Sequence, residues 1–194
     1  MIRAKLKQKQ SNQLRIIGGE WRGRKLDFPD VQSLRPTSDR IRETLFNWLQ
    51  FDVVGAHCLD LFAGSGALGF EALSRGAASV SFVDEHPKAI SQIKSNAEIL
   101  KTDSAHCVQA NALSFLENLR NDIIYDVVFL DPPFQQEFLP KMIAAMTAGN
   151  ILKSGSLVYV EMEKQLTLQG MPKNWQLQKD KIAGQVRYML FQVD

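Results

Sequence analysis

The chain has 194 residues, of which 45% are hydrophobic and 23% charged, and its formal net charge is +2. These values are typical of a soluble protein of one globular domain, and no apolar run reaches the ~18–20 residues that a membrane span requires. The two cysteines, Cys58 and Cys107, lack the C-x-x-C spacing of a zinc site or redox motif, so a cytoplasmic protein without disulfides is expected.

Positive charge is concentrated at the N-terminus. Residues 1–25 carry eight basic side chains and one acidic side chain, a net charge of +7, so the remaining residues have a net charge of −5. Residues 1–12 have almost no apolar content and are predicted to be a disordered basic arm. Residues 13–30 predict an N-terminal hairpin extension, because two short strand-like runs flank a glycine-rich stretch. Such a segment favours a polyanionic partner, with a solvated tail as the alternative.

The remaining residues, 31–194, predict one α/β domain. A helix capped by Ser38 or Thr37 comes first, and apolar strands then alternate with helical stretches. This alternation is typical of a parallel sheet with helices on both faces, and three strand-like runs at the end of the chain predict an antiparallel edge. The strands are predicted at residues 58–63, 80–84, 105–109, 125–131, 154–163, 175–182 and 186–193, and the later helices at 67–75, 87–100, 111–120 and 136–148.

A glycine motif follows the first strand of this domain. Gly64, Gly66 and Gly69 form a G-x-G-x-x-G pattern where a strand ends and a helix begins. Glycine there lets the backbone approach a ligand, and the helix N-terminus offers unpaired N–H groups. Asp84 ends the next strand, where an acid accepts hydrogen bonds from ribose hydroxyls. The pattern by itself therefore predicts a nicotinamide or flavin dinucleotide.

Two features favour a different nucleoside. Asp60 lies four residues before Gly64, and a fixed carboxylate there would repel a pyrophosphate but suits a cationic ligand. Too few residues follow the fourth strand for the separate substrate domain of a dehydrogenase. S-adenosylmethionine, a sulfonium without phosphates, fits both features. Asn111, which opens the helix after the third strand, either hydrogen-bonds the adenine or caps that helix, and the sequence leaves both open.

The fourth strand ends in F-L-D-P-P-F, residues 129–134. The two prolines fix the backbone and remove two N–H donors, so the Asp131 carboxylate and the Pro132 carbonyl remain as acceptors and Phe134 adds a flat apolar face. Two acceptors that bind the hydrogens of an aromatic amine direct its lone pair at the sulfonium methyl, while Phe134 stacks on the unstacked base. We interpret these three residues as catalytic, with a tight turn after a buried strand as the alternative.

Metal chemistry is not indicated. The three histidines, His57, His86 and His106, have neither ligand spacing nor partner carboxylates in the sequence pattern. We interpret them as structural or surface residues and expect no metal.

Five runs together resemble one family. The glycine loop and D-P-P-F alone are typical of any class I amino-methyltransferase, and R-P-T-x-D-R-x-R-E-T-L-F-N is the specific part. The runs are G-G-E-W-R-G-R-K-L (18–26), L-R-P-T-S-D-R-I-R-E-T-L-F-N-W-L (34–49), D-L-F-A-G-S-G-A-L-G-F-E-A-L-S-R-G-A (60–77), F-L-D-P-P-F (129–134) and A-G-Q-V-R-Y (183–188). On these runs, the chain after residue 13 resembles the bacterial 16S rRNA guanine-N(2)-methyltransferases that modify guanine-966.

The resemblance implies a Rossmann-like class I methyltransferase fold, with a seven-stranded, mostly parallel sheet behind an N-terminal β-hairpin. It implies methyl transfer from S-adenosylmethionine to the exocyclic amine of a guanine in 16S rRNA of the small ribosomal subunit. Arg35, Pro36 and Thr37 would line the methionine end or the base entrance. Carried over by position, Asp131, Pro132 and Phe134 are catalytic, and the residues around the cofactor are Asp60, Phe62, Ala63, Gly64, Gly66, Asp84 and Asn111.

A large RNA needs contacts beyond this pocket. The basic residues of the hairpin, Arg15, Arg22, Arg24 and Lys25, are predicted to contact phosphates beside the target loop. Trp21 either stacks on a base or packs the hairpin on the domain. We expect the protein to act as a monomer.

Two other activities share parts of the pattern. A DNA adenine-N(6) methyltransferase uses the same D-P-P-F, but usually carries a larger target-recognition region than this chain offers. An NAD-dependent dehydrogenase is the interpretation of the glycine motif alone.

Overall fold

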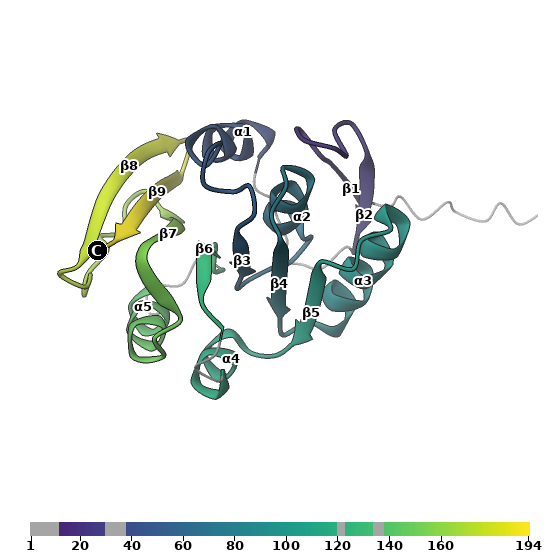
Figure 1. Ribbon diagram of the computed structural model, residues 1–194. Helices are drawn as coiled ribbons and strands as arrows, with labels where there is room; N and C mark the ends of the chain where they lie inside the picture. Colours follow the sequence, from purple (N-terminus) through teal and green to yellow (C-terminus); the bar gives the residue numbers. More distant parts are fainter. Residues whose placement is uncertain (1–11, 30–37, 120–122, 134–137) are drawn as a thin grey trace, which may run out of the picture.

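The computed structural model describes residues 12–29, 38–119, 123–133 and 138–194, which form one main sheet flanked by helices and a separate two-stranded hairpin (Figure 1). The hairpin consists of β1 (Asn12–Arg15) and β2 (Lys25–Phe28). The helices are α1 (Asp39–Trp48), α2 (Ala67–Ser74), α3 (Pro87–Leu100), α4 (Ala112–Asn118) and α5 (Phe138–Ala148), and the strands of the main sheet are β3 (His57–Asp60), β4 (Ser79–Asp84), β5 (Ala105–Gln109), β6 (Tyr125–Leu130), β7 (Leu152–Glu163), β8 (Trp175–Ala183) and β9 (Val186–Val193).

The main sheet has seven strands in the order β5-β4-β3-β6-β7-β9-β8. Strands β3 to β7 pair in parallel, and β9 pairs antiparallel with both β7 and β8. The predicted fold class, a mostly parallel sheet with an antiparallel C-terminal edge and an N-terminal hairpin, is therefore confirmed. The parallel strands β3 to β7 all end at one boundary of the sheet, which we call the carboxyl edge. We call the boundary at which they begin the amino edge.

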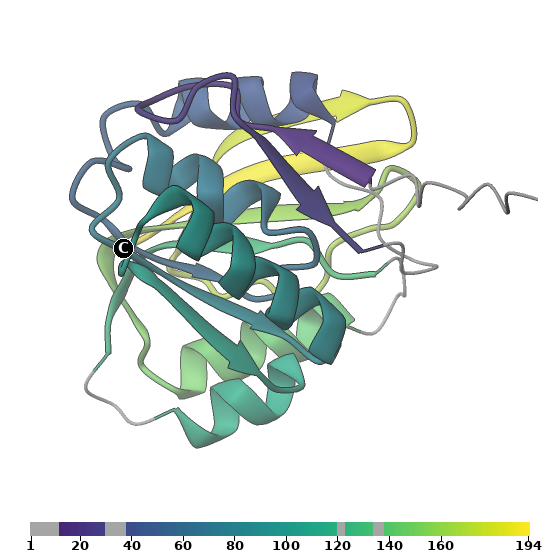
Figure 2. The ribbon, with the colours of Figure 1, turned by 90° about the vertical axis from the view of Figure 1, so that its right-hand side faces the viewer.

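Each face of the sheet is covered by its own apolar layer (Figure 2). Helices α1, α2 and α3 and the hairpin pack on one face, and α4 and α5 pack on the other. The central strands β3 and β6 are buried on both faces, which explains why their sequences read as continuous apolar runs rather than as an alternation.

Element boundaries differ from the prediction mainly where the site begins. The strand predicted at residues 58–63 ends at Asp60, because the following residues turn into the glycine loop instead of extending the ladder. The helix predicted from residue 111 begins at Ala112, with Asn111 as its N-cap. Helix α1 begins after Ser38, whose hydroxyl accepts a hydrogen bond from the Ile41 N–H at 3.4 Å; Thr37, the other predicted cap, lies outside the described residues.

The hairpin is fastened to α2 through polar groups that are buried between them. The carboxylate of Glu71, fully buried, accepts hydrogen bonds from the backbone N–H groups of Ile17 and Gly18 at 2.8 Å each. Arg75 pairs with the same carboxylate at 2.8 Å, and Arg42 of α1 lies 3.7 Å from it. Part of the R-P-T-S-D-R-I-R-E-T run is thus explained by structure, because Arg42 is buried in the joint between hairpin, α1 and α2.

Ser74 completes this joint, and its removal should loosen the hairpin. The Ser74 hydroxyl donates to the Gly18 carbonyl at 2.6 Å and accepts from the Trp21 N–H at 2.9 Å. Ser74→Ala leaves both backbone groups unpaired, so we expect the free energy of unfolding to fall by about 1–3 kcal/mol. Urea denaturation measures this, and hydrogen exchange at the Trp21 amide should accelerate. Ser79→Ala, which removes a hydroxyl bonded only to the exposed His57 ring among the described residues, should have a smaller effect.

Candidate active site

The candidate site lies where the order of the parallel strands reverses, between β3 and β6. The chain proceeds from β3 through β4 to β5 on one side and from β6 to β7 on the other, and in open α/β sheets such a reversal marks the ligand-binding crevice at the carboxyl edge. Asp60 pairs with Phe129 in the register of the two strands, and the Leu61 N–H donates to the Phe129 carbonyl at 3.2 Å. Asp131 follows the end of β6, so both acids lie at this crevice.

The glycine loop is shaped by two distinct constraints. Gly66, the N-cap of α2, has a φ of +78°, and a Cβ there would lie 2.8 Å from the Phe70 ring. Gly69 lies within α2, and a Cβ there would lie 2.2 Å from the Phe82 ring on β4. Gly66 therefore permits the turn into helix α2, and Gly69 permits the close packing of α2 on strand β4.

Two acids hold this loop in place. The Gly64 N–H donates to Asp84 Oδ2 at 2.8 Å, and the Gly69 N–H donates to Asp60 Oδ2 at 3.1 Å. Asp60 is 3% exposed. Burial raises the pKa of Asp60 to about 7; the Gly69 hydrogen bond opposes this shift, and the charges of Asp131 and Asp84 add to it. Three acids thus share one small region, and a bound cation would lower the cost of their ionisation.

The neighbourhood of Asp84 differs from the prediction in one respect. His86, which we expected to have no partner carboxylate, lies with Nδ1 3.3 Å from Asp84 Oδ1, and its backbone N–H donates to the same oxygen at 2.8 Å. The spacing of two residues was the signal, because an aspartate commonly accepts a hydrogen bond from the backbone two residues later. No group of three or more metal-binding side chains gathers within the described ranges.

Asn111 caps the N-terminus of helix α4. Its Oδ1 accepts from the Leu113 N–H at 3.1 Å and from the Ser114 N–H at 3.4 Å, and its Nδ2 donates to Glu85 Oε2 at 3.4 Å. Capping is therefore shown, and contact with adenine stays a prediction. Glu85, an exposed acid beside Asn111 that the sequence interpretation passed over, lies next to the ribose-binding candidate Asp84.

The other predicted site residues divide into two groups. Ala63 is buried and donates its N–H to the Val83 carbonyl at 2.9 Å, and Phe62 packs edge-on against Phe138 with ring centroids 6.1 Å apart. Pro132 is buried beside the partly buried Asp131. The predicted catalytic Phe134 and the predicted entrance residues Arg35, Pro36 and Thr37 lie outside the described residues.

Sequence interpretation missed an acid on β7. Glu161 is 3% exposed, and its Oε1 accepts a hydrogen bond from the buried Tyr159 hydroxyl at 2.7 Å. The signal lay in the run V-Y-V-E-M-E, where a glutamate occupies a position inside an otherwise apolar buried strand. Since Leu130 pairs with Val160, Asp131 and Glu161 are the next residues along these two adjacent strands.

Three of the four predicted RNA-binding residues lie at the hairpin turn, toward the end of the sheet opposite this crevice. Arg22, Arg24 and Lys25 are exposed around the turn of the hairpin, and Arg24 Nη1 donates to the carbonyl of Ile99, in the last turn of α3, at 3.5 Å. Helix α3 leads from the carboxyl edge to the amino edge, so the hairpin turn lies near the amino edge (Figure 2). Arg15 forms an exposed ion pair with Asp39 at 3.4 Å. Trp21 packs against the core, in agreement with its structural alternative.

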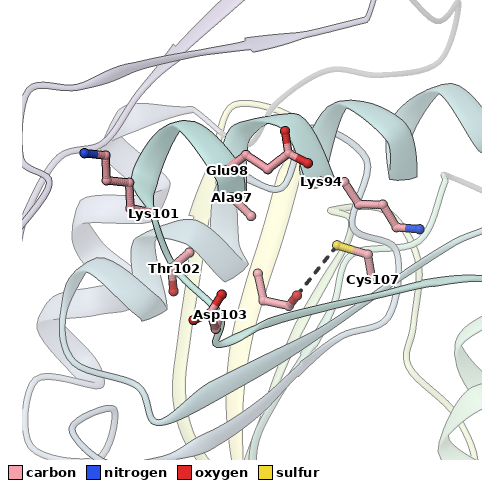
Figure 3. A pocket seen from close by; sticks show the side chains of 8 residues that line it. Lys94, Ala97, Glu98, Lys101, Thr102, Asp103 and Cys107 are labelled. Carbon is pink, nitrogen blue, oxygen red and sulfur yellow. Dashed lines mark hydrogen bonds between the residues drawn. The ribbon is translucent and has the colours of Figure 1, made fainter.

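A surface groove of about 420 Å³ lies between α3 and β5 (Figure 3). Its lining includes Lys94, Lys101 and Cys107, and none of the predicted catalytic or cofactor residues contributes to it. It is therefore a feature apart from the crevice at β3 and β6. Every helix in the described parts of the chain is too short or too polar to cross a membrane.

Comparison with known proteins identifies the family. The family model described as Conserved hypothetical protein 95 matches residues 14–192. Ribosomal RNA small subunit methyltransferase D of Escherichia coli K12 is 48% identical over 182 residues, which cover 94% of this chain and 91% of the relative. The solved structure of yhhF from Escherichia coli is 46% identical, has a TM-score of 0.85, and is matched over 94% of this chain and 99% of that one.

A more distant structure shares the fold. SMU.776 complexed with SAH is 16% identical, has a TM-score of 0.72, and is matched over 87% of this chain and 53% of that one. The long match to the family model and the high identity to the E. coli relative agree with the glycine loop, the D-P-P run and the sheet order. The chain therefore belongs to the family described as Conserved hypothetical protein 95 and is a homologue of Ribosomal RNA small subunit methyltransferase D.

Proposed function

We propose that the protein is an RNA methyltransferase that transfers the methyl group of S-adenosylmethionine to the exocyclic N2 amine of guanine-966 in 16S rRNA of the small ribosomal subunit. The observation that carries the proposal is that the Asp131-Pro132 segment lies beside the acids and the glycine loop at the ends of β3 and β4, in a chain homologous over most of its length to a small-subunit rRNA methyltransferase. The choice of guanine-966 and of N2 rests on the resemblance of the R-P-T-x-D-R-x-R-E-T-L-F-N run. The proposed acting form is a monomer.

The residues of the crevice fit S-adenosylmethionine better than a dinucleotide. When bound, this cofactor supplies a methyl group on a positively charged sulfur. The carboxyl groups of Asp60, Asp84 and Asp131 lie together at the carboxyl edge, where a bound sulfonium would favour the ionised form of Asp60 and a pyrophosphate would oppose it. Asp84, at the end of β4, would accept hydrogen bonds from the ribose hydroxyls. The NAD-dependent alternative is disfavoured by the same charges.

The catalytic step is assigned to the Asp-Pro-Pro segment after β6. The Asp131 carboxylate and the Pro132 carbonyl would each accept a hydrogen bond from one N–H of the guanine amine. These two bonds direct the nitrogen lone pair toward the methyl group. These hydrogen bonds strengthen as positive charge develops on the nitrogen, and such differential binding accelerates a reaction. Phe134 would hold the unstacked base, with stacking worth about 1–3 kcal/mol. A DNA adenine-N(6) methyltransferase could use the same Asp-Pro-Pro segment, so the substrate must be tested directly.

The test of the function is methylation of ribosomal RNA with a mapped product. Small subunits from cells lacking the gene, incubated with the protein and S-adenosylmethionine, should gain one methyl group at guanine-966, detected by mass spectrometry of nuclease fragments. NAD should neither bind nor support any reaction. Methylation of a different nucleotide would overturn the target, and transfer to duplex DNA but not to rRNA would establish the DNA alternative.

The basic hairpin should contribute to RNA binding without affecting the cofactor. Because phosphate contacts release counterions, replacing Arg22, Arg24 and Lys25 with alanine should flatten the salt dependence of RNA affinity by about 0.7–0.9 in slope per lost contact. The measurement is affinity for small-subunit RNA across a salt series.

The matched control is Lys153→Ala with Lys173→Ala, which removes exposed positive charge beyond the hairpin. Its slope per removed charge should change less than that of the hairpin variant. Equal slopes for wild type and hairpin variant would show that the hairpin is a solvated basic segment. Because the hairpin turn lies near the amino edge, these substitutions do not alter the proposed cofactor residues at the carboxyl edge.

A further inference from the structure

A buried acid with its own hydrogen-bond donor lies beside the proposed catalytic acid. Glu161 is 3% exposed and Tyr159 is fully buried, and the Tyr159 hydroxyl donates to Glu161 Oε1 at 2.7 Å. Burying a carboxylate is costly unless hydrogen bonds stabilise it, so this pair is not an incidental feature of an apolar strand. Glu161 has no part in the cofactor and base contacts proposed above.

The register of the sheet places Glu161 next to Asp131. Phe129 pairs with Tyr159 and Leu130 with Val160, so Asp131 and Glu161 follow on two strands that run in parallel. Side chains alternate between the faces of a strand, which puts Asp131 on the face of Phe129 and Glu161 on the face of Tyr159. The Phe129 and Tyr159 rings contact each other with centroids 6.5 Å apart, so these are the same face.

An aromatic side chain of β9 also neighbours Glu161. Tyr188 pairs with it across β9 and stacks on Trp48 of α1 with ring centroids 5.4 Å apart. Lys181 Nζ lies over the Trp48 ring, 5.9 Å from its centroid. Further along the carboxyl edge lie the acids Asp60 on β3 and Asp84 on β4, with His86 beside Asp84.

The phenol in this pair is fixed as a donor. Burial and the charges of Glu161 and Asp131 raise the pKa of Tyr159 well above its ordinary value, so the hydroxyl keeps its proton. A hydrogen bond donated to a carboxylate favours the charged form of that carboxylate. The hydrogen bond from Tyr159 therefore favours the ionised form of Glu161 beside Asp131.

We propose that Glu161, held by Tyr159, is a positioning residue whose charge makes Asp131 a strong acceptor for the amine proton. This inference rests on the proposed function. Methylation forms a bond from the amine nitrogen to the methyl carbon and breaks the carbon–sulfur bond, whose electron pair stays on sulfur. The nitrogen then bears a positive charge until one N–H bond breaks, and the proton passes to the Asp131 carboxylate. A neighbouring negative charge increases the affinity of Asp131 for that proton.

The test is the pH dependence of a single turnover. Methyl transfer should fall on the acid side as Asp131 becomes protonated, and Glu161→Gln should move this acid limb to lower pH by about one unit, because a like charge has been removed. At high pH the variant should be slower than wild type, and the ratio of the variant's rate to the wild-type rate should rise as the pH falls. Asp126→Asn, which alters an acid at the other end of β6 that pairs with Lys153, should leave the limb unchanged.

The position of the acid limb in the variants decides whether Glu161 acts on Asp131. A folded Glu161→Gln protein with an unmoved limb would overturn the proposal, since a purely structural acid changes stability but not the titration. If this variant does not fold, Tyr159→Phe replaces it, and a limb shifted in the same direction supports the proposal while an unshifted limb overturns it. The failure of the proposed function is separate, because it would appear as absence of rRNA methylation by the wild-type protein.

Discussion

Replacing Asp131 with alanine should lower the rate of methyl transfer to rRNA by about 10²–10³-fold, the usual cost of removing one positioned group that stabilises charge in a transition state. The affinity for S-adenosylmethionine should remain within a few-fold, because the carboxylate is proposed to act on the amine of the base. Single-turnover transfer to small subunits measures the first quantity, and calorimetry with the cofactor measures the second.

Asp131→Asn separates charge from hydrogen bonding. The amide keeps one acceptor oxygen but cannot take the proton, so its rate should lie near that of the alanine variant and should lose its acid limb. If Asp131→Ala turned over at close to the wild-type rate, the acceptor mechanism would be wrong, and the Pro132 carbonyl would have to suffice. A loss of cofactor affinity equal to the loss of rate would instead place Asp131 in the cofactor site.

The sequence was sufficient to predict the fold and the convergence of Asp60, Gly64, Asp84 and Asp131 at one end of the sheet, because both depend on local patterns. Alternating apolar strands and helices specify the parallel sheet, and the glycine loop, Asp84 and D-P-P-F each mark the carboxyl end of a strand. Their convergence follows from topology, since the ends of parallel strands meet at one edge.

Contacts between distant segments were not predictable in this way. Glu71 looks like one more residue of a helix, and only the folded chain brings the backbone of residues 17 and 18 to its carboxylate. Glu161 likewise acquires its neighbour Asp131 through strand pairing across some 30 residues of chain, a register that apolar patterning does not reveal. The position of the basic hairpin turn near the amino edge depends on the same long-range docking.

Asp60 should make the stability of the empty protein fall as the pH rises. Burial, against the opposing Gly69 hydrogen bond, raises its pKa to about 7, whereas an unfolded aspartate ionises near pH ~4. Between these values the folded protein holds a proton that the unfolded chain has lost. The contribution of Asp60 to stability is therefore greatest at and below pH ~4 and declines until the pH exceeds 7, by about 4 kcal/mol in total for some three pKa units.

Asp60→Asn tests this linkage because the amide oxygen can still accept from the Gly69 N–H while the titration is removed. The free energy of unfolding of the variant relative to wild type should rise between pH 4 and pH 8. A constant difference would show that Asp60 ionises normally in the folded protein.

The same titration should distinguish S-adenosylmethionine from its demethylated product, because only the former carries the sulfonium charge. A cation beside Asp60 favours the ionised carboxylate, so S-adenosylmethionine should bind more tightly as the pH rises through 7, and the product should change little. In Asp60→Asn this difference between the ligands should disappear. Asp84→Asn is the matched control, since its proposed ribose contact is common to both ligands and its loss should weaken both alike. If the two ligands kept the same affinity ratio from pH 5 to pH 8 in the wild-type protein, Asp60 would be a loop-fastening residue, and the charge that selects the sulfonium would have to come from Asp131 and Asp84.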